Sequence, residues 1–172
     1  VFEGRALSPD LLPSQVTCLP RSAVPGGPEF FCGGPLGPDG VPTVLRARSG
    51  ERARLCFYYE LEQPPGGGLI QGLSMALAYD CRLECLEDTF EVPPESITAA
   101  VNADFVDFQC DDDPDDGDGC EMILGILVDS LPPFNGTALP PTIGTPLLLA
   151  CVQLEVGGGV ELDECLEIRF RD

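Results

Sequence analysis

Residues 54–61 read RLCFYYEL, and this short stretch decides the class of fold. Every second side chain in it is apolar and falls on one side of an extended chain: Leu55, Phe57, Tyr59 and Leu61. The intervening residues, two of them charged, fall on the other side. A repeat of two residues is that of a β-strand with one buried face. We therefore predict a strand here.

The same alternation, or a continuous apolar run of strand length, recurs along the chain. Strands are predicted at residues 72–79 (GLSMALAY), 121–130 (EMILGILVDS), 146–156 (PLLLACVQLEV) and 165–171 (CLEIRFR). Segments rich in proline and glycine separate them, and the one helical candidate is PPESITAAVNA. This pattern predicts an all-β domain over residues 45–172, an antiparallel β-sandwich or jelly roll.

Residues 1–44 differ in composition from the rest of the chain. The run LPRSAVPGGPEFFCGGPLGPDGVP is dense in proline and glycine, which excludes a helix and disfavours a central strand. We predict an extended N-terminal arm. Its pieces VFEGRAL (1–7) and SQVTCL (14–19) alternate and could each add a strand to an open sheet edge. That edge could belong to a neighbouring subunit, or the arm could cover an edge of its own sandwich.

The composition excludes many functions. The 172 residues include 29 acids and nine bases, a formal net charge of −20, and histidine, lysine and tryptophan are absent. Such a surface repels nucleic acid and anionic lipid. Without histidine or lysine there is no Ser-His or Cys-His nucleophile pair, no imidazole ligand and no Schiff base. We therefore expect a protein that is not an enzyme and binds no nucleic acid.

Cysteine usage indicates the compartment. The chain has nine cysteines, no histidine and no C-x-x-C pair, which favours disulfides in an oxidising, extracellular setting over zinc. We predict a Cys110–Cys120 bond closing the acidic loop, and next a Cys18–Cys32 bond. The odd number leaves one thiol free or joins two chains. No apolar run is long enough to span a bilayer. The start at Val1 in place of Met is expected either from removal of a leader or because the chain is a segment of something longer.

Residues 110–121 read CDDDPDDGDGCE, with six aspartates and one glutamate and no base among them. Calcium takes about six to eight oxygen ligands on a flexible backbone, and glycines within the run allow tight turns. The predicted ligands are Asp111, Asp113, Asp115, Asp116, Asp118 and Glu121. The frame does not match an EF-hand loop. A solvated acidic loop is the alternative, and a catalytic carboxylate pair is a third.

Four further residues are candidates for lesser roles. Asp104, Asp107 and Asp129 flank apolar strands, where they would add ligands to the calcium site or, singly, cap turns. Asn135 opens the tripeptide NGT, a glycosylation sequon in a proline-rich loop. A glycan on Asn135 is therefore an expectation for a secreted protein.

A family resemblance rests on LIQGLSMALAYDCRLECLE, residues 69–87, and on the terminal pair LLLACVQLEV and LEIRF. These stretches resemble the cohesin signature, in which an alternating strand leads to Tyr-Asp and a turn. The resemblance covers residues 41–172. It implies a secreted jelly-roll module used for protein–protein attachment, often with bound calcium. The many cysteines and the long acidic loop depart from typical cohesins.

Together these features predict a secreted, calcium-binding structural subunit of an extracellular fibre or surface assembly. Copies would join head-to-tail through the N-terminal arm and through calcium held at residues 110–121. One alternative is a cohesin-like adhesion or scaffold module that binds a different protein. Another is a carbohydrate-binding module, which the low aromatic content disfavours, with nine Phe, three Tyr and no Trp.

Overall fold

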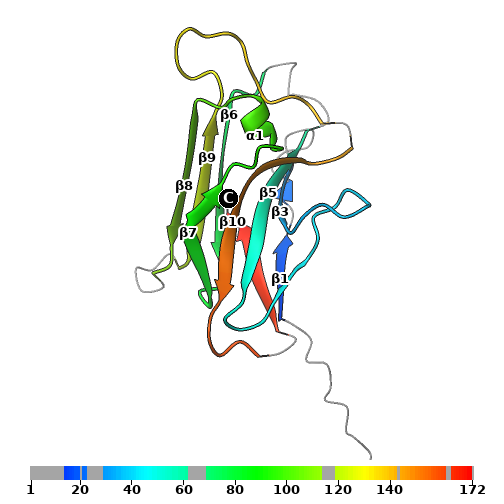
Figure 1. Cartoon of the computed structure of the whole chain (residues 1–172), viewed down its shortest axis with the longest axis vertical. Coiled ribbons are helices and arrows are strands. Elements are labelled where there is room, and N and C mark those ends of the chain that lie inside the picture. The colour runs from blue at the N-terminus through cyan, green and yellow to red at the C-terminus, as the bar shows by residue number, and fades with distance from the viewer. Residues whose placement is uncertain are drawn as a thin grey trace, which may run out of the picture.

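Two β-sheets packed face to face form the body of the protein, with their strands along the long axis of the molecule (Figure 1). This computed structural model describes the backbone of residues 14–19 and 21–22, and the whole of residues 29–61, 69–113, 119–142, 144–161 and 164–171. The all-β sandwich predicted from the alternating segments is confirmed at this level.

Sheet A has six strands, in the order β4 (Leu45–Ala47), β1 (Ser14–Leu19), β11 (Cys165–Phe170), β6 (Gly72–Tyr79), β9 (Glu121–Leu127) and β8 (Phe105–Asp111). Sheet B has five, in the order β2 (Arg21–Ser22), β3 (Glu29–Gly33), β5 (Arg52–Glu60), β10 (Leu147–Val156) and β7 (Leu83–Glu91). Neighbouring strands are antiparallel, except that β1 runs parallel to β11, with Val16 opposite Leu166.

The helical candidate is confirmed as one turn, α1 (Ile97–Ala100). Ser96 caps it, because its side-chain oxygen accepts a hydrogen bond from the Ala99 backbone N–H at 3.1 Å. Among the described residues, no helix is long and apolar enough to cross a membrane.

The core lies between the sheets. It contains the apolar side chains that the alternation in residues 54–61 predicted to be buried. Leu55 and Phe57 are fully buried, and Tyr59 and Leu61 are 1% exposed. Burying side chains of this size contributes roughly 2 kcal/mol each. The alternating side chains of β6 from Met75 to Tyr79 enter the same core.

The outer side of β5 is also buried at Cys56 and Tyr58, although Arg54 on the same side is exposed. The alternating pattern had predicted only one buried face. Cys56 and Tyr58 form a second small core with Cys151 of β10, and Phe31 and Leu36 pack against it. Leu36 belongs to the segment between β3 and β4, which folds over sheet B, and the Tyr58 hydroxyl donates to the Gly34 carbonyl at 3.0 Å. This second core gives the proline- and glycine-rich segment a structural role.

The predicted boundary at residue 44, between an extended arm and the β-sandwich, therefore needs correction. Strands β1, β2 and β3 all come from residues 1–44, and they supply both sheets. SQVTCL does form a strand, β1, and it pairs with β4 and β11 of its own chain. VFEGRAL lies outside the described residues, so its predicted role as a donor strand stays a prediction.

The predicted Cys110–Cys120 pairing is wrong. Cys110 bonds to Cys85, which joins β8 of sheet A to β7 of sheet B, and Cys120 bonds to Cys81. The third described disulfide, Cys56–Cys151, links β5 to β10. These bonds connect neighbours in space, and spacing along the chain does not reveal them.

The remaining cysteines differ in their bonding. Cys32 is disulfide-bonded, but the side chain of Cys18 lies outside the described residues, so the Cys18–Cys32 pairing stays a prediction. Cys165, at the start of β11, is a free and exposed thiol. Three described disulfides fit an oxidising environment.

Candidate functional site

The acidic loop joins β8 to β9 at one end of sheet A. Asp111 ends β8, Glu121 begins β9, and the two residues are direct cross-strand partners. The Asp113 backbone N–H donates to the Asp111 carboxylate at 3.0 Å. Asp111 and Asp113 are exposed. The remaining predicted ligands, Asp115, Asp116 and Asp118, lie outside the described residues.

Asp112 has a structural role that sequence reasoning missed. Its carboxylate accepts hydrogen bonds from the Tyr79 hydroxyl and from the Cys85 backbone N–H, the latter at 3.2 Å. Burial, and then this bond, raise the pKa of Tyr79 far above its ordinary value. With the Cys85–Cys110 bond beside it, Asp112 fixes the base of the acidic loop to β6 and β7. All three residues Asp111–Asp113 are exposed, but the carboxylate of Asp112 is directed toward Tyr79 and Cys85.

The carboxylate of Glu121, a predicted calcium ligand, already has a partner. It forms an ion pair with Arg171 at 3.0 Å, and its side chain is 18% exposed. Calcium would have to compete with Arg171 for this carboxylate. Within the part of the chain that the structure describes, no group of three or more Asp, Glu or Cys side chains is arranged to hold a metal.

Two of the three flanking aspartates are turn caps. Asp104 accepts hydrogen bonds from the backbone N–H groups of Ser130 and Leu131, at 2.6 and 3.0 Å. Asp129 accepts from those of Asn135 and Gly136, both at 2.8 Å. The turn-capping interpretation is thus correct for both. Asp107 accepts a bond from Gln109 on the same strand.

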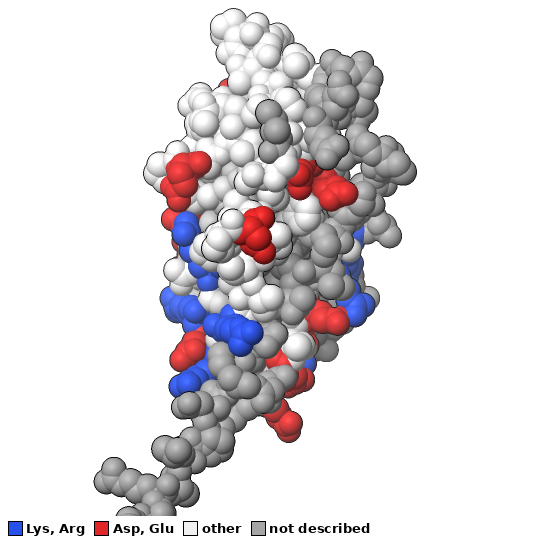
Figure 2. Space-filling model, turned by 90° about the vertical axis from the view of Figure 1, so that its right-hand side faces the viewer, with Lys and Arg blue, Asp and Glu red and all other residues white. Residues whose placement is uncertain are grey.

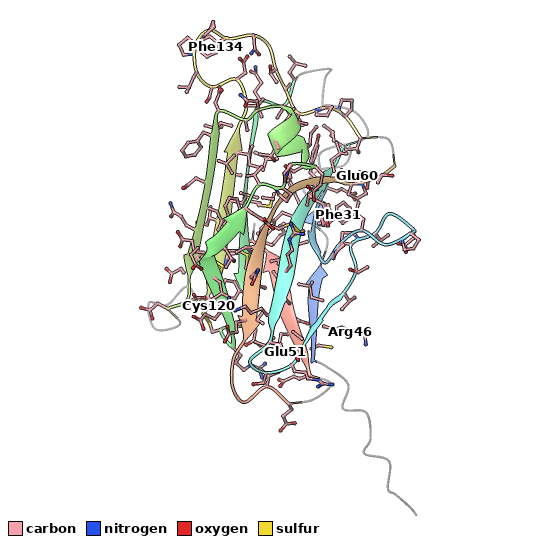
Figure 3. The ribbon with its side chains drawn as sticks, in the orientation of Figure 1. Phe31, Arg46, Glu51, Glu60, Cys120 and Phe134 are labelled. Carbon is pink, nitrogen blue, oxygen red and sulfur yellow. A yellow bond between two sulfur atoms is a disulfide. The ribbon has the colours of Figure 1, made fainter. Side chains whose placement is uncertain are left out.

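The loop that these caps hold, residues 128–138, forms the upper end of the molecule and carries Phe134 near its tip (Figure 3). Leu131 is 62% exposed and Phe134 is 70% exposed. In the face shown in Figure 2, this end is almost free of charged residues, which gather lower down. Asn135 is also exposed, and its side-chain oxygen accepts a bond from the Thr137 N–H at 2.8 Å. A glycan on it stays a prediction.

A second candidate site is the part of β6 that β11 does not reach. In the ladder with β9, β6 is paired from Gly72 to Ala78. On its other side, β11 pairs only with residues 77–79, and one further bond joins the Arg171 N–H to the Ala76 carbonyl at 2.8 Å. In Figure 1 the C-terminal end of β11 lies about halfway up the sandwich, whereas β6 continues to the upper end.

The backbone groups on this side of β6 point toward the gap. The Val128 N–H donates to the Gln71 carbonyl at 2.7 Å, so the odd-numbered residues of the strand direct their N–H and C=O groups to β9. Gly72 and Ser74 therefore direct theirs to the opposite side. Neither has a hydrogen-bond partner there among the described residues, and both are exposed. Among the described residues, no strand therefore lies beside this half of β6.

Beneath this half of β6 is an apolar cavity of about 160 Å³. Its lining includes Phe30 of β3, Tyr59 of β5, Leu73 of β6 and Leu139. The Tyr59 hydroxyl donates to the Pro140 carbonyl, so this phenol presents its ring to the cavity and not an unpaired polar group. The cavity lies where the inward side chains of a strand beside Gly72–Ala76 would be.

Comparison with protein-family models and with curated proteins finds no match for this chain.

Proposed function

We propose that this protein is a structural subunit of an extracellular fibre or surface assembly, whose copies join head-to-tail through the N-terminal segment and through calcium. The observation that carries the proposal is that, within the described part of the chain, Gly72 and Ser74 of β6 have no neighbouring strand and lie beside an apolar cavity. Unpaired strand groups of this kind bind an added strand through backbone hydrogen bonds, and side-chain pockets give the register.

The disulfides support the extracellular part of the proposal. Cys85–Cys110 ties the edge strands of the two sheets together, and Cys81–Cys120 ties the β6–β7 turn to β9. A module cross-linked in this way suits an oxidising environment and a role in which it bears mechanical load. Secretion and fibre formation are inferred from these features together.

Calcium at residues 110–121 is part of the same proposal. Asp111 and Asp113 offer exposed carboxylates at the base of the loop, and the net charge of −20 favours a bound divalent cation. Asp115, Asp116 and Asp118 would complete the ligand set. A calcium ion shared by carboxylates of two copies would make assembly depend on the metal.

A cohesin-like adhesion module is the second candidate, and the loop at residues 128–138 favours it. Asp104 and Asp129 hold that loop while Leu131 and Phe134 project into solvent. Exposed large apolar side chains on a firmly held loop suit contact with a different protein.

Electron microscopy of the native protein before and after chelation of calcium tests the proposal. Filaments that dissociate on chelation, and do not re-form with magnesium alone, are expected. Filaments that survive would leave the N-terminal segment as the joint, and calcium would then stabilise each subunit internally. Monomers under both conditions would refute the fibre proposal and favour the adhesion module.

A further inference from the structure

We propose that the Asn135–Gly136 peptide is a latent deamidation site, which the Asp129 carboxylate keeps inactive and whose conversion releases the loop at residues 128–138. This inference goes beyond the proposed function and does not depend on it. It concerns the chemistry of one loop and not the contacts between copies of the chain.

Deamidation joins two groups that are adjacent in the sequence. The backbone nitrogen of Gly136 gives its proton to hydroxide and attacks Cγ of Asn135. A C–N bond forms and the Cγ–Nδ2 bond breaks. The departing nitrogen takes a proton from water, so ammonia leaves and hydroxide is regenerated. Water then opens the cyclic imide at either carbonyl, which gives aspartate or isoaspartate. Nothing is oxidised or reduced, and Gly136 has no side chain to hinder the attack.

The Asn135 side chain is already placed for this reaction. Its oxygen accepts hydrogen bonds from the Thr137 backbone N–H, at 2.8 Å, and from the Thr137 hydroxyl. Attack on Cγ moves negative charge onto that oxygen, and donors aimed at an oxygen where charge develops lower the barrier. Asn135 and Gly136 are both exposed, so hydroxide and water reach them.

The Gly136 nitrogen, in contrast, is held away from the reaction. Its N–H donates to Asp129 Oδ2 at 2.8 Å, while the Asn135 N–H donates to Oδ1 of the same carboxylate at 2.8 Å. In the cyclic imide, Cγ of Asn135 takes the place in the peptide plane that this hydrogen occupied. The nitrogen therefore cannot attack while its hydrogen points to Asp129. The negative carboxylate also disfavours loss of the proton.

Asp129 is fixed to the body of the sandwich. Its side chain accepts a further bond from Gln71 Nε2 at 3.2 Å. The preceding residue, Val128, is 1% exposed, and its N–H donates to the Gln71 carbonyl at 2.7 Å. Deamidation in the folded chain therefore requires a local opening that breaks the two Asp129 bonds to the loop, and the frequency of that opening sets the rate.

Conversion would prevent these bonds from forming again. Aspartate at position 135 places a second negative charge beside Asp129. Isoaspartate adds one methylene to the main chain between the two N–H groups that this carboxylate holds. Either product weakens the cap, so Leu131 and Phe134, which project from the same loop, lose their fixed position (Figure 3). The loop thus works as a one-way switch.

The predicted glycan would act on the same nitrogen atom. A glycan on Nδ2 of Asn135 would block the loss of ammonia, and deamidation would destroy the glycan acceptor. The two modifications therefore exclude each other. A chain without the glycan depends on Asp129 alone to preserve Asn135.

Peptide mapping by mass spectrometry tests the protection. The full chain, produced without glycan, is kept at mildly alkaline pH, and Asn, Asp and isoAsp at position 135 are measured with time. The folded wild type should convert at least about tenfold more slowly than the same chain unfolded in urea. Asp129→Ala should convert nearly as fast as the unfolded chain. Asp129→Asn, which keeps one acceptor oxygen without the charge, should lie between them.

Asp104→Ala is the matched control. It removes the other cap of the same loop, at Ser130 and Leu131, and leaves both bonds of Asp129 intact. It should convert as slowly as the wild type, and circular dichroism melts show whether each variant is folded. Equal acceleration by Asp104→Ala would show that general loosening of the loop sets the rate, and would overturn the inference. Equal rates for the folded and unfolded wild type would also overturn it, even if Asp129→Ala fails to fold.

Hydrogen exchange tests the release. Wild-type chain is converted in mildly alkaline urea with its disulfides intact and then refolded. The control spends the same time in mildly acidic urea, where hydroxide is too scarce for conversion. Residues 128–138 of the converted chain should exchange at least about tenfold faster than those of the control, with β9 unchanged. Equal exchange of the loop in both samples would refute the switch.

Discussion

Tyr58, Tyr59 and Tyr79 are the three tyrosines of the chain, and burial is the main cause that raises the pKa of each phenol. The pKa of Tyr59 rises to about 12. A phenol whose pKa is higher in the folded than in the unfolded state stabilises the fold fully below its unfolded pKa. That contribution is lost as the pH rises through the folded value.

We therefore expect the folded protein to show no tyrosinate absorbance when the pH first exceeds about 10, the ordinary tyrosine value. The signal should appear only at higher pH, together with loss of the circular dichroism of the fold. The chain unfolded in urea, which should titrate near pH 10, is the control. A phenol that ionises near pH 10 in the folded state would contradict the burial of these three side chains.

At the scale of elements, the Cys85–Cys110 disulfide closes one side of the sandwich. It joins β7, at the edge of sheet B, to β8, at the edge of sheet A, across a sequence separation of 25 residues. Edge strands are otherwise held by a single neighbour each, so this bond holds the two sheets together where their ladders end.

Replacing Cys85 and Cys110 together by alanine should lower the free energy of unfolding by about 3 kcal/mol, from the loop-closure entropy of the unfolded chain. Urea denaturation under non-reducing conditions measures the change. Cys165→Ser is the control and should leave the midpoint unchanged, because that thiol is free and exposed. An unchanged midpoint in the double variant would show that the bond does not hold the sheets.

At the scale of the whole molecule, the net charge of −20 opposes the compact state through self-repulsion. Sodium chloride should raise the melting temperature gradually by screening this repulsion. Calcium bound at residues 110–121 should raise it at far lower concentration, because binding to the native state adds its own stabilisation.

Melting curves at matched ionic strength, in sodium, magnesium or calcium chloride, test this expectation. The variant Asp113→Asn with Asp115→Asn should lose the extra stabilisation by calcium and keep the response to sodium. An equal response of the wild type to the three salts at matched ionic strength would remove calcium from the proposal and leave a solvated acidic loop.

Local pattern predicted much of this fold, since the repeat of side chains along a strand depends only on neighbours in the chain. Residues 72–79 and 165–171 were predicted as strands, and the helical turn at Ile97–Ala100 follows from Ser96 and the residues after it. β7 and β8 were not predicted. In β7 the adjacent charges of Glu87 and Asp88 interrupt the alternation. In β8, Val106, Phe108 and Cys110 do alternate with polar residues, so its pattern was present in the sequence.

The sequence by itself determined the all-β class, the buried side of residues 54–61, the acidic charge and the disulfide-rich chemistry. Tertiary structure alone decided that Cys110 pairs with Cys85 and that residues 34–43 cover part of the outer side of β5. The physical reason is that periodicity is a property of adjacent residues. Disulfide pairing and the covering of one segment by another depend on which distant segments meet, and only the packed chain brings them together.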